Sequence, residues 1–478
     1  MKDEVKADCR PFILHPSEAG SFMKFKNLLT TTFLTAALVA PAATAAQTKK
    51  TRGPATAGAQ PVKAEVENAA AGPFDQKRFE TLRTDGFEAL YNLDYEGARR
   101  RFRELTTAFP THPAGYQLLA AGLWLKTLNE SRRLQASLYN NEGFYKEKDD
   151  KVDPKVQAEF RELTRKAKEL SEARLKLNPK DTDALYYLGA IEGLKAAWGS
   201  MVERSFMAAM GSGKDSVNHH RDLLKIDPTY VDAKVTIGMY DYVVGSLPAL
   251  VKLGATFIGY RGSKKRGLAT LEEVAREGRW ARDDAKSLLI ALLKRERRYR
   301  DAYTYASELA AKYPRNYLLK MEAADALVSQ AEVDRATNPE AARKTEAEAF
   351  AVFDSLLAPA AGPNAPKVPL DLVHYNYGDA LLVAGQAERA AKELAAAAAV
   401  PGAQASMVTR ARLRGAQALD LAGRRDEAVA QYKAVLALPN VYDSHEDAKR
   451  GLKEPYKLTR KVGENGPNGE QTSDAKAQ

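Results

Sequence analysis

The sequence predicts an all-α fold built from repeated helix pairs, and three observations lead to this class. Apolar residues make up 45% of the 478 positions, with a large share of alanine and leucine, which favours helices. Runs of β-branched residues bounded by turn residues are nearly absent, so strands are not expected. Fixed spacings between small and large apolar residues also recur from about residue 79 to residue 453.

The first 45 residues carry an export pattern. A short basic segment begins at Met23, an uncharged apolar run covers residues 28–40, and small residues follow at Ala43 and Ala45. This order is typical of a signal peptide cut after Ala45, and the run is shorter than the roughly 20 apolar residues of a spanning helix. We therefore predict that translation starts at Met23, that residues 1–22 are an upstream mis-start, and that the mature protein is periplasmic or secreted.

Removal of residues 1–45 would also change the chemistry that the chain can perform. It takes away Cys9, the one cysteine, so disulfides and thiolate sites are not expected. It removes five basic and four acidic side chains, so the formal net charge moves only from +10 to +9. A basic balance bears on solubility and on attraction to anionic surfaces. Residues 46–73 are rich in Ala, Gly, Pro, Thr and Lys without an apolar period, which predicts a disordered linker.

One set of spacings is used four times beyond Phe74. Its first occurrence has offsets of four, seven and twelve residues from a leading alanine to a closing proline. The four sets are Ala98, Phe102, Leu105, Pro110; Ala302, Ala306, Leu309, Pro314; Ala390, Leu394, Ala397, Pro401; and Ala428, Tyr432, Val435, Pro439. The closing proline comes one residue early in the last two sets. One structural unit is therefore being repeated.

A second small residue stands twelve positions before the leading alanine in three of the four sets, at Gly86, Gly378 and Ala416. Two small residues at this separation let paired antiparallel helices approach closely, while the proline ends the second helix. This pattern resembles the tetratricopeptide-repeat (TPR) family, whose unit is a helix-turn-helix of about 34 residues. The resemblance covers about residues 79–453 and implies an α-solenoid of antiparallel helix pairs.

The repeat pattern also predicts the domain plan. Residues 74–357 form an irregular array, in which residues 126–153 look inserted and Asn338-Pro339 interrupts a pair of long helices. Residues 358–369 contain four prolines and predict a linker. Residues 370–457 hold the C-terminal pairs, and residues 458–478 are expected to be a disordered tail.

The TPR resemblance implies binding of a partner protein on the inner face, which the first helix of each pair lines. Polar and aromatic residues on those helices are the candidate contacts, although each could equally serve ordinary packing between repeats. They are Tyr91, Tyr116, Tyr186, Tyr240, Asp241, His374 and Asn376.

No catalytic, metal or cofactor site is expected, so we predict that the protein is not an enzyme. Residues 210–216 partly match the phosphate-binding loop of nucleotide-binding proteins. However, Ala208 stands where that motif requires Gly, and Asp215 stands where it requires Ser or Thr. A turn between helices is therefore the better interpretation. The neighbours His219 and His220 would point about 100° apart on a helix, which disfavours a shared zinc ion. Binding of nucleic acid is not expected either.

One segment departs from ordinary repeat character. Residues 242–260 are apolar with a single charge, and a basic cluster follows directly at Arg261, Lys264, Lys265 and Arg266. Residues 252–300 carry fourteen Lys or Arg and six Asp or Glu, which gives +8. The glycine and proline spacing here faintly resembles TPR proteins of inclusion-body clearance at the mitochondrial outer membrane.

These observations lead to two functional hypotheses. The first is an exported TPR scaffold or adaptor that binds another protein of the cell envelope. The alternative is a peripheral binder of an anionic membrane surface or envelope polymer through the basic segment 252–300, since an apolar element followed by cations suits such an interface. A third interpretation of the segment, an extended helix pair that caps part of the array, assigns it no ligand.

Overall fold

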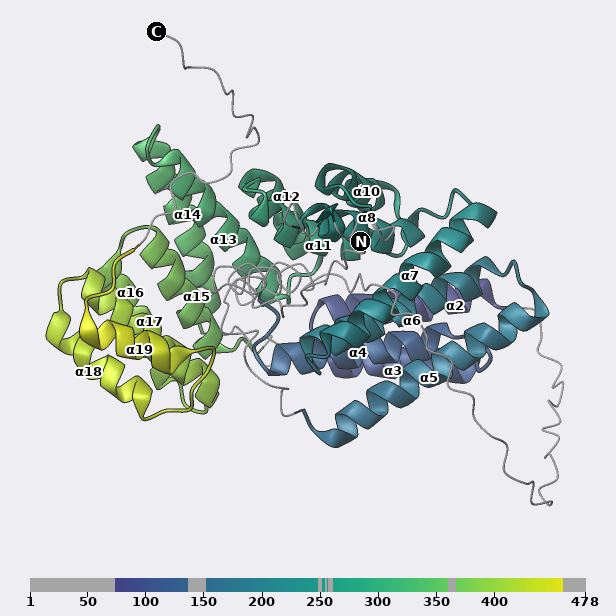
Figure 1. Ribbon diagram of the computed structural model, residues 1–478, viewed down its shortest axis with the longest axis horizontal. Helices are drawn as coiled ribbons and strands as arrows, with labels where there is room; N and C mark the ends of the chain where they lie inside the picture. Colours follow the sequence, from purple (N-terminus) through teal and green to yellow (C-terminus); the bar gives the residue numbers. More distant parts are fainter. Residues whose placement is uncertain are drawn as a thin grey trace, which may run out of the picture. The chain divides into compact units, whose positions relative to one another are not determined.

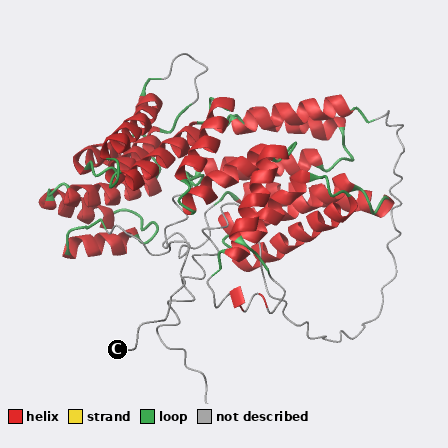
Figure 2. Ribbon diagram, turned by 90° about the horizontal axis from the view of Figure 1, so that it is seen from above, coloured by secondary structure: helices red, strands yellow, loops and turns green. Residues whose placement is uncertain are grey.

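The computed structural model describes residues 74–135, 152–247, 252–253, 256, 261–359 and 367–458. Within them the regular elements are all helical (Figures 1 and 2). The elements are α2 (Gln76–Tyr91), α3 (Tyr95–Ala108), α4 (Ala114–Glu130), α5 (Pro154–Leu177), α6 (Thr182–Met201), α7 (Phe206–Ile226), η3 (Val231–Ala233), α8 (Lys234–Gly245), α10 (Lys264–Glu277), α11 (Arg282–Arg295), α12 (Tyr299–Lys312), α13 (Tyr317–Asp334), α14 (Pro339–Leu357), α15 (Leu370–Val383), α16 (Ala387–Ala399), α17 (Ala405–Leu421), α18 (Arg425–Leu436) and α19 (Ser444–Lys453).

The chain divides into two compact units. The first comprises residues 1–330 with 359–367, and the second comprises residues 331–358 with 368–478. In the first unit the helices pair as α2 with α3, α4 with α5, α6 with α7, α8 with α10 and α11 with α12. In the second unit α15 pairs with α16 and α17 with α18, while α14 packs on α15 and α19 on both α17 and α18. Helix α14, which was predicted to belong to the preceding array, packs on α15 and lies in the C-terminal unit.

The four repeated spacings mark buried helix contacts. Each alanine and each large apolar residue of the four sets is 1% exposed or less, as expected when these positions face the paired helix. Helices α3 and α12 end two residues before Pro110 and Pro314, because proline lacks the backbone donor that would continue them. The predicted fold class, an all-α array of antiparallel helix pairs of the tetratricopeptide type, is confirmed.

Small residues permit the close approach within each pair. A Cβ added at Gly86 would lie 2.2 Å from Cε1 of Phe102, and one at Gly378 would lie 2.5 Å from Cγ of Leu394. In both cases the first helix has a glycine at the contact, and a large side chain of the second helix packs against the backbone of that glycine. The twelve-residue separation in the sequence therefore predicted the contact correctly.

The turn inside the repeats has a conserved backbone shape along this chain. Leu93, Arg297, Gly385 and Gly423 stand five residues before the leading alanines of the four sets, and all have a positive φ between 60° and 78°. Glycine adopts this left-handed conformation without strain, whereas leucine and arginine do so at a cost. The turns therefore keep the same geometry even where the sequence does not favour it.

One local prediction is wrong. The stretch Gly211–Ser216, interpreted as a turn between helices, lies inside α7. Ser216 is buried there and its hydroxyl donates to the carbonyl oxygen of Gly189 in α6, at 2.7 Å. Ser216 is thus a small residue at a close helix contact, whereas a Cβ added at Gly211 would meet no atom within 4 Å.

Several predictions fall outside the described residues. They are the signal peptide, the linker over residues 46–73, the tail beyond residue 458 and the core of the inserted segment, residues 136–151. In the portion of the chain that is described, no helix combines the length and the apolar character needed to cross a membrane.

Candidate protein-interaction surfaces

The interior of the first unit is closed by its own helices. Tyr91 at the end of α2 stacks on Tyr313, with ring centroids 4.8 Å apart, and its hydroxyl donates to the carboxylate of Asp284 in α11. Asn316 donates to the backbone oxygen of Tyr91 at 2.7 Å, and Tyr317 donates to Asn129 of α4 at 2.8 Å. Residues about 190–225 positions apart in the chain therefore meet, and the first helix pair contacts α11 to α13.

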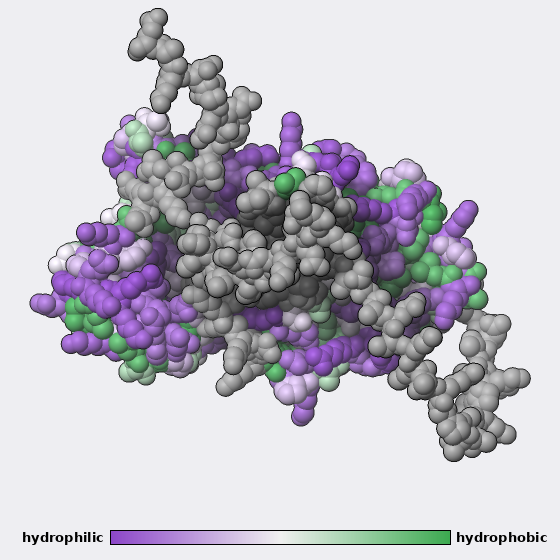
Figure 3. Space-filling view, viewed as in Figure 1, coloured by the Kyte–Doolittle hydropathy of each residue, from purple (hydrophilic) through white to green (hydrophobic). Residues whose placement is uncertain are grey.

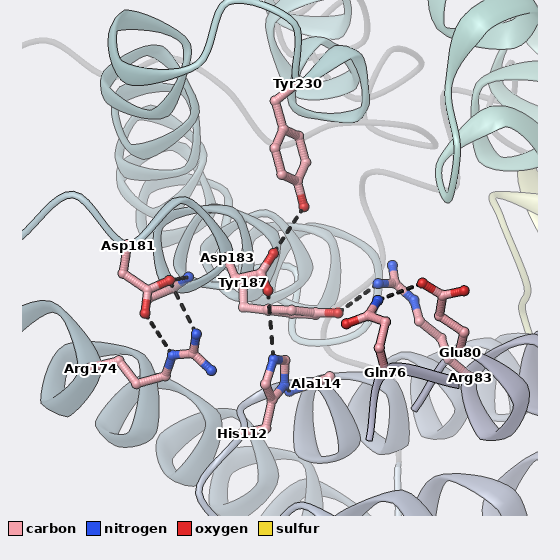
Figure 4. A network of polar contacts seen from close by, with 11 residues as sticks. Gln76, Glu80, Arg83, His112, Ala114, Arg174, Asp181, Asp183, Tyr187 and Tyr230 are labelled. Carbon is pink, nitrogen blue, oxygen red and sulfur yellow. Dashed lines mark hydrogen bonds and ion pairs between the residues drawn. The ribbon is translucent and has the colours of Figure 1, made fainter. Parts of the chain in front are cut away.

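Arg83 is a buried charged residue of the first unit and belongs to a network of polar contacts (Figure 4). It projects from α2, is only 4% exposed, and donates to the hydroxyl of Tyr187 in α6 at 2.7 Å. Its guanidinium carbon lies 4.1 Å from the ring centroid of Trp280, between α10 and α11, which is a close cation–π distance. One arginine thus joins three elements. At the edge of the same cluster Arg279 forms an ion pair with Glu80.

The other side of the cluster is also internally satisfied (Figure 4). Asp181 receives two bonds from Arg174, at 2.9 and 3.2 Å. The Nδ1 atom of His112 accepts from a backbone amide at 3.2 Å, and burial lowers the pKa of this imidazole. Its Nε2 atom lies 3.9 Å from Asp183, whose side chain is half exposed. These polar groups join helices of the first unit, while the buried Nε of Arg83 has no hydrogen-bond partner.

The candidate residues of the first unit take part in this internal structure. Tyr91 bonds to Asp284, and Tyr186 stacks on His220 with ring centroids 5.5 Å apart. Tyr116 packs against the core of the first two pairs. Tyr240 is 5% exposed and lies 5.1 Å from the guanidinium of Arg221, while Asp241 is buried and paired with Arg266.

A groove of about 730 Å³ runs along the corner where the α2–α3 turn meets the α12–α13 turn. Its wall carries four acidic side chains, at Asp85, Glu88, Asp94 and Glu104, and four basic ones, at Arg100, Arg101, Lys312 and Arg315. Because the charges balance, the groove shows no preference for an anionic or a cationic partner.

The basic cluster after the apolar segment is partly neutralised. Lys264 forms an ion pair with Glu296 at 2.8 Å, and Arg266 pairs with Asp241. Among the described residues, Arg261 and Lys265 are exposed and form no ion pair. The start of the apolar segment, from Tyr242 to Val244, is buried in the core of the α8–α10 pair. Residues 248–251, 254–255 and 257–260 lie outside the described part of the chain.

A second polar cluster lies on the neighbouring helices α15 and α17 of the C-terminal unit, each of which is the first helix of its pair. Tyr375 and Asp379 stand one turn apart on α15, and Arg410 and Arg414 stand one turn apart on α17. Arg414 donates to the carboxylate of Asp379 at 2.6 Å. The guanidinium carbon of Arg410 lies 4.5 Å from the ring centroid of Tyr375. We call these four residues the α15–α17 face.

The segment before α19 completes this face. The ring centroid of Tyr442 lies 5.9 Å from the guanidinium carbon of Arg410. Tyr442 and Asp443 both have a positive φ, 52° and 61°, which bulky residues rarely adopt. The segment is held by side-chain bonds: the backbone amide of Val441 donates to Ser444 at 3.0 Å, and that of His445 donates to Asn440 at 3.0 Å. The ring is therefore fixed beside Arg410.

His374 and Asn376, the candidates from the sequence, flank Tyr375 but face elsewhere. The imidazole of His374 lies 2.7 Å from Glu393 of α16, and the amide of Asn376 donates to the backbone oxygen of Leu372 at 2.8 Å. Tyr375, which is not among the candidates from the sequence, is the residue of α15 whose ring meets Arg410 of α17. The sequence does contain a sign of this contact: Tyr375 and Asp379 are four residues apart, and so are Arg410 and Arg414, so each pair lies on one side of its helix.

One face of the molecule can be compared for polar and apolar character. On the face shown in Figure 3, hydrophilic side chains cover most of the described surface. The residues that the structure describes contain no group of three or more His, Cys, Asp or Glu side chains that could hold a metal ion. Binding through aromatic and charged side chains is what this surface can do chemically.

No family model and no curated protein matches the chain. Solved structures with a related arrangement of helices include human IFIT1 as a dimer with m7Gppp-AAAA, at 12% identity and a TM-score of 0.41, covering 80% of this chain and 86% of that one. The yeast protein Tom70 is 13% identical with a TM-score of 0.33, covering 79% and 95%. A tetratricopeptide repeat protein from Parabacteroides merdae ATCC 43184 is 13% identical with a TM-score of 0.28, covering 71% and 99%. At these values the fold class rests on the helix pairs themselves, and this chain is similar to each protein in helical architecture alone.

Proposed function

We propose that this protein is an exported scaffold that holds another protein of the cell envelope, and that the partner docks on the α15–α17 face. The observation that carries the proposal is the set of tyrosine and arginine side chains there, in which the rings of Tyr375 and Tyr442 are buried while Arg410 and Arg414 are partly exposed. Tyrosine, tryptophan and arginine dominate the binding energy of protein interfaces, because they combine large contact area with directed polar groups.

The contrast between the two units supports this choice of surface. In the first unit the inner tyrosines bond to residues of the same unit, as Tyr91 does to Asp284 and Tyr187 to Arg83. A partner could reach them only by breaking these bonds. On the α15–α17 face, Arg410 contacts two aromatic rings, is hydrogen-bonded to Tyr375 and, within the described residues, forms no ion pair. The export part of the proposal is supported by the signal pattern that begins at Met23.

The test is crosslinking in intact cells, followed by denaturing purification of the tagged full-length chain and identification of the bound proteins. We expect one exported protein to recur at a defined stoichiometry. Recovery of no recurrent protein, or only of cytoplasmic proteins, would contradict the proposal.

A second candidate, binding to an anionic membrane surface or envelope polymer, is supported by Arg261 and Lys265. Both are exposed, Arg261 just before α10 and Lys265 in its first turn, and neither forms an ion pair in the described part of the chain. Each basic residue near an anionic surface contributes about 1 kcal/mol. Two such residues give a weak, salt-sensitive attraction, which suits an auxiliary contact better than the main function.

A further inference from the structure

We infer that residues 454–458 form a strap that covers part of the α15–α17 face, and that a tyrosine-containing segment of the partner protein displaces it. This inference rests on the proposed function, because it names how binding at the same face is regulated. It is carried by the contacts of Tyr456, the one residue of the strap that is not exposed.

The strap follows the last helix directly. Helix α19 ends at Lys453, and Glu454 already has extended backbone angles, φ −144° and ψ 148°. Pro455 comes next, and proline disfavours a helical conformation in the residue before it and supplies no backbone donor. The chain therefore leaves the helix and continues through residues 455–458 without regular secondary structure.

Tyr456 attaches the strap to α17 at two places. Its backbone amide donates to the carboxylate of Asp420 at 2.8 Å, and Arg414 donates to its hydroxyl at 3.4 Å. Asp420 and Arg414 are six residues apart on α17, so the tyrosine lies along about 9 Å of the helix. Arg414 also donates to Asp379 of α15 at 2.6 Å. The hydroxyl end of Tyr456 therefore reaches the arginine that joins α17 to α15, which is a member of the α15–α17 face.

The attachment point on α17 has partners other than the strap. The side chain of Asp420 is fully buried, and it accepts from Arg425 and from the hydroxyl of Tyr432, both at 2.9 Å. These two residues belong to α18 and fix the carboxylate independently of Tyr456. Any extended segment with a backbone N–H at this place can therefore bond to Asp420 as Tyr456 does. A tyrosine in such a segment also supplies the hydroxyl that meets Arg414.

The other residues of the strap lie open to solvent. Glu454, Pro455, Lys457 and Leu458 are exposed, and Leu458 is 38% exposed although its side chain is apolar. Hydrogen bonds near the surface replace bonds to water and contribute little net stability, so the strap opens more easily than the helices beneath it. While it is closed it competes with a partner, since a segment of the same chain has an effective concentration on the order of millimolar. The strap thus sets a threshold that a partner segment must exceed.

The test uses the full-length chain and a synthetic peptide with the sequence of residues 453–458, which carries a fluorophore at its N-terminus and an amide at its C-terminus. Fluorescence anisotropy measures its binding to wild type, Tyr456→Ala and Lys457→Ala. Tyr456→Ala releases the strap and should bind the peptide about tenfold more tightly than wild type, in which a strap closed about nine-tenths of the time lowers the apparent affinity by that factor. Lys457→Ala is the matched control from the same strap, and because Lys457 is exposed it should stay within about twofold of wild type.

Changes in the peptide separate its two contacts without altering the protein. Phenylalanine in place of the peptide's tyrosine removes the hydroxyl that meets Arg414, and should weaken binding to Tyr456→Ala about threefold or more. Alanine at the same place should abolish binding. Circular dichroism and thermal unfolding establish that each protein variant is folded.

Hydrogen exchange of the wild-type chain gives a second measurement that needs no variant. The amide of Tyr456 donates to a buried carboxylate, so it is protected while the strap is closed. If the strap opens by itself, this amide should exchange at a rate that low concentrations of urea leave unchanged, whereas amides in the middle of α17 exchange more slowly. Exchange as slow as that of α17 would show that the segment opens only when the unit unfolds, and would overturn the strap.

The outcomes separate this inference from the proposed function. Equal binding of the peptide by wild type and Tyr456→Ala, or binding by neither, would overturn the strap. If a cellular partner is still crosslinked in that case, the scaffold function stands without it. Tighter binding by Tyr456→Ala supports the strap even if the crosslinking experiment finds no partner, which would defeat the scaffold proposal alone. Where both hold, Tyr456→Ala should increase the amount of partner that is crosslinked.

Discussion

The substitution Gly86→Ala tests the helix contact on which every repeat depends. The added Cβ would lie 2.2 Å from Cε1 and 2.7 Å from Cδ1 of Phe102. Phe102 is fully buried, so its ring cannot turn into solvent to make room. The ring or the whole of α3 must therefore move away from α2.

Two opposing terms set the magnitude. Alanine is favoured over glycine in a helix interior by about 0.8–1.0 kcal/mol, whereas overpacking of a well-packed core costs about 1–3 kcal/mol. Gly122→Ala measures the first term alone, because Gly122 is also helical but only the Cδ1 atom of Leu90, at 3.8 Å, would touch its Cβ. We expect Gly86→Ala to be less stable than Gly122→Ala by about 1–3 kcal/mol.

Urea unfolding followed by circular dichroism measures both variants. The double variant Gly86→Ala with Phe102→Leu should recover part of the loss, since the smaller side chain leaves space for the Cβ, and residues in contact show such non-additive effects of about 0.5–3 kcal/mol. If Gly86→Ala is as stable as Gly122→Ala, Phe102 does not pack on Gly86 and the helix register of the first repeat is wrong.

Three further predictions concern processing, pH and the membrane hypothesis. The mature N-terminus should be Ala46, and N-terminal sequencing of the exported protein that finds Met23 instead would refute cleavage. His220 is 2% exposed, and burial lowers its pKa to about 4, below the value of about 6.5 in an unfolded chain. The neutral imidazole therefore makes its full contribution to the free energy of unfolding above about pH 6.5. This free energy falls by about 3 kcal/mol as the pH drops to about 4, because the unfolded chain then binds a proton more readily. Unfolding free energies of wild type and His220→Gln at pH 8 and pH 4.5 measure this loss, and an identical pH dependence of the two proteins would contradict it. Arg261→Glu with Lys265→Glu should reduce sedimentation with anionic vesicles at low salt and leave neutral vesicles unaffected, whereas equal, weak binding by wild type and variant would remove the membrane hypothesis.

The sequence predicted those parts of the fold that local spacing determines. The repeated positions around Ala98 and Ala302 are buried as expected, because a helix pair needs small and large residues at fixed offsets. It did not predict the closure of the first unit. Tyr91 and Asp284 are 193 residues apart, and no periodic pattern links a tyrosine at one helix end to a carboxylate on a distant helix. Gly211 was misassigned because glycine favours turns locally, while close packing of α6 on α7 keeps the helix intact.

The candidates from the sequence include His374 and Asn376 of α15 and leave out Tyr375, whose ring contacts Arg410 of α17. His374, Tyr375 and Asn376 are adjacent, so on a helix they point in three directions about 100° apart. Only the contacts of α15 with α16 and α17 decide which of them faces the neighbouring inner helix. The position of Tyr442 depends on two consecutive residues with positive φ, and non-glycine residues give no sequence signal for that conformation.

The most direct test of partner docking on the α15–α17 face is photo-crosslinking in intact cells from a chosen position on α17. A photoreactive phenylalanine analogue replaces Gln417, which bonds to Arg414 at 2.8 Å, and in a second strain it replaces Lys433, which is exposed on α18. We predict that one exported protein is captured from position 417, that it is not captured from position 433, and that Arg410→Gln reduces the capture. Capture of the same proteins from both positions, or of none from position 417, would contradict the claim that this face holds a partner.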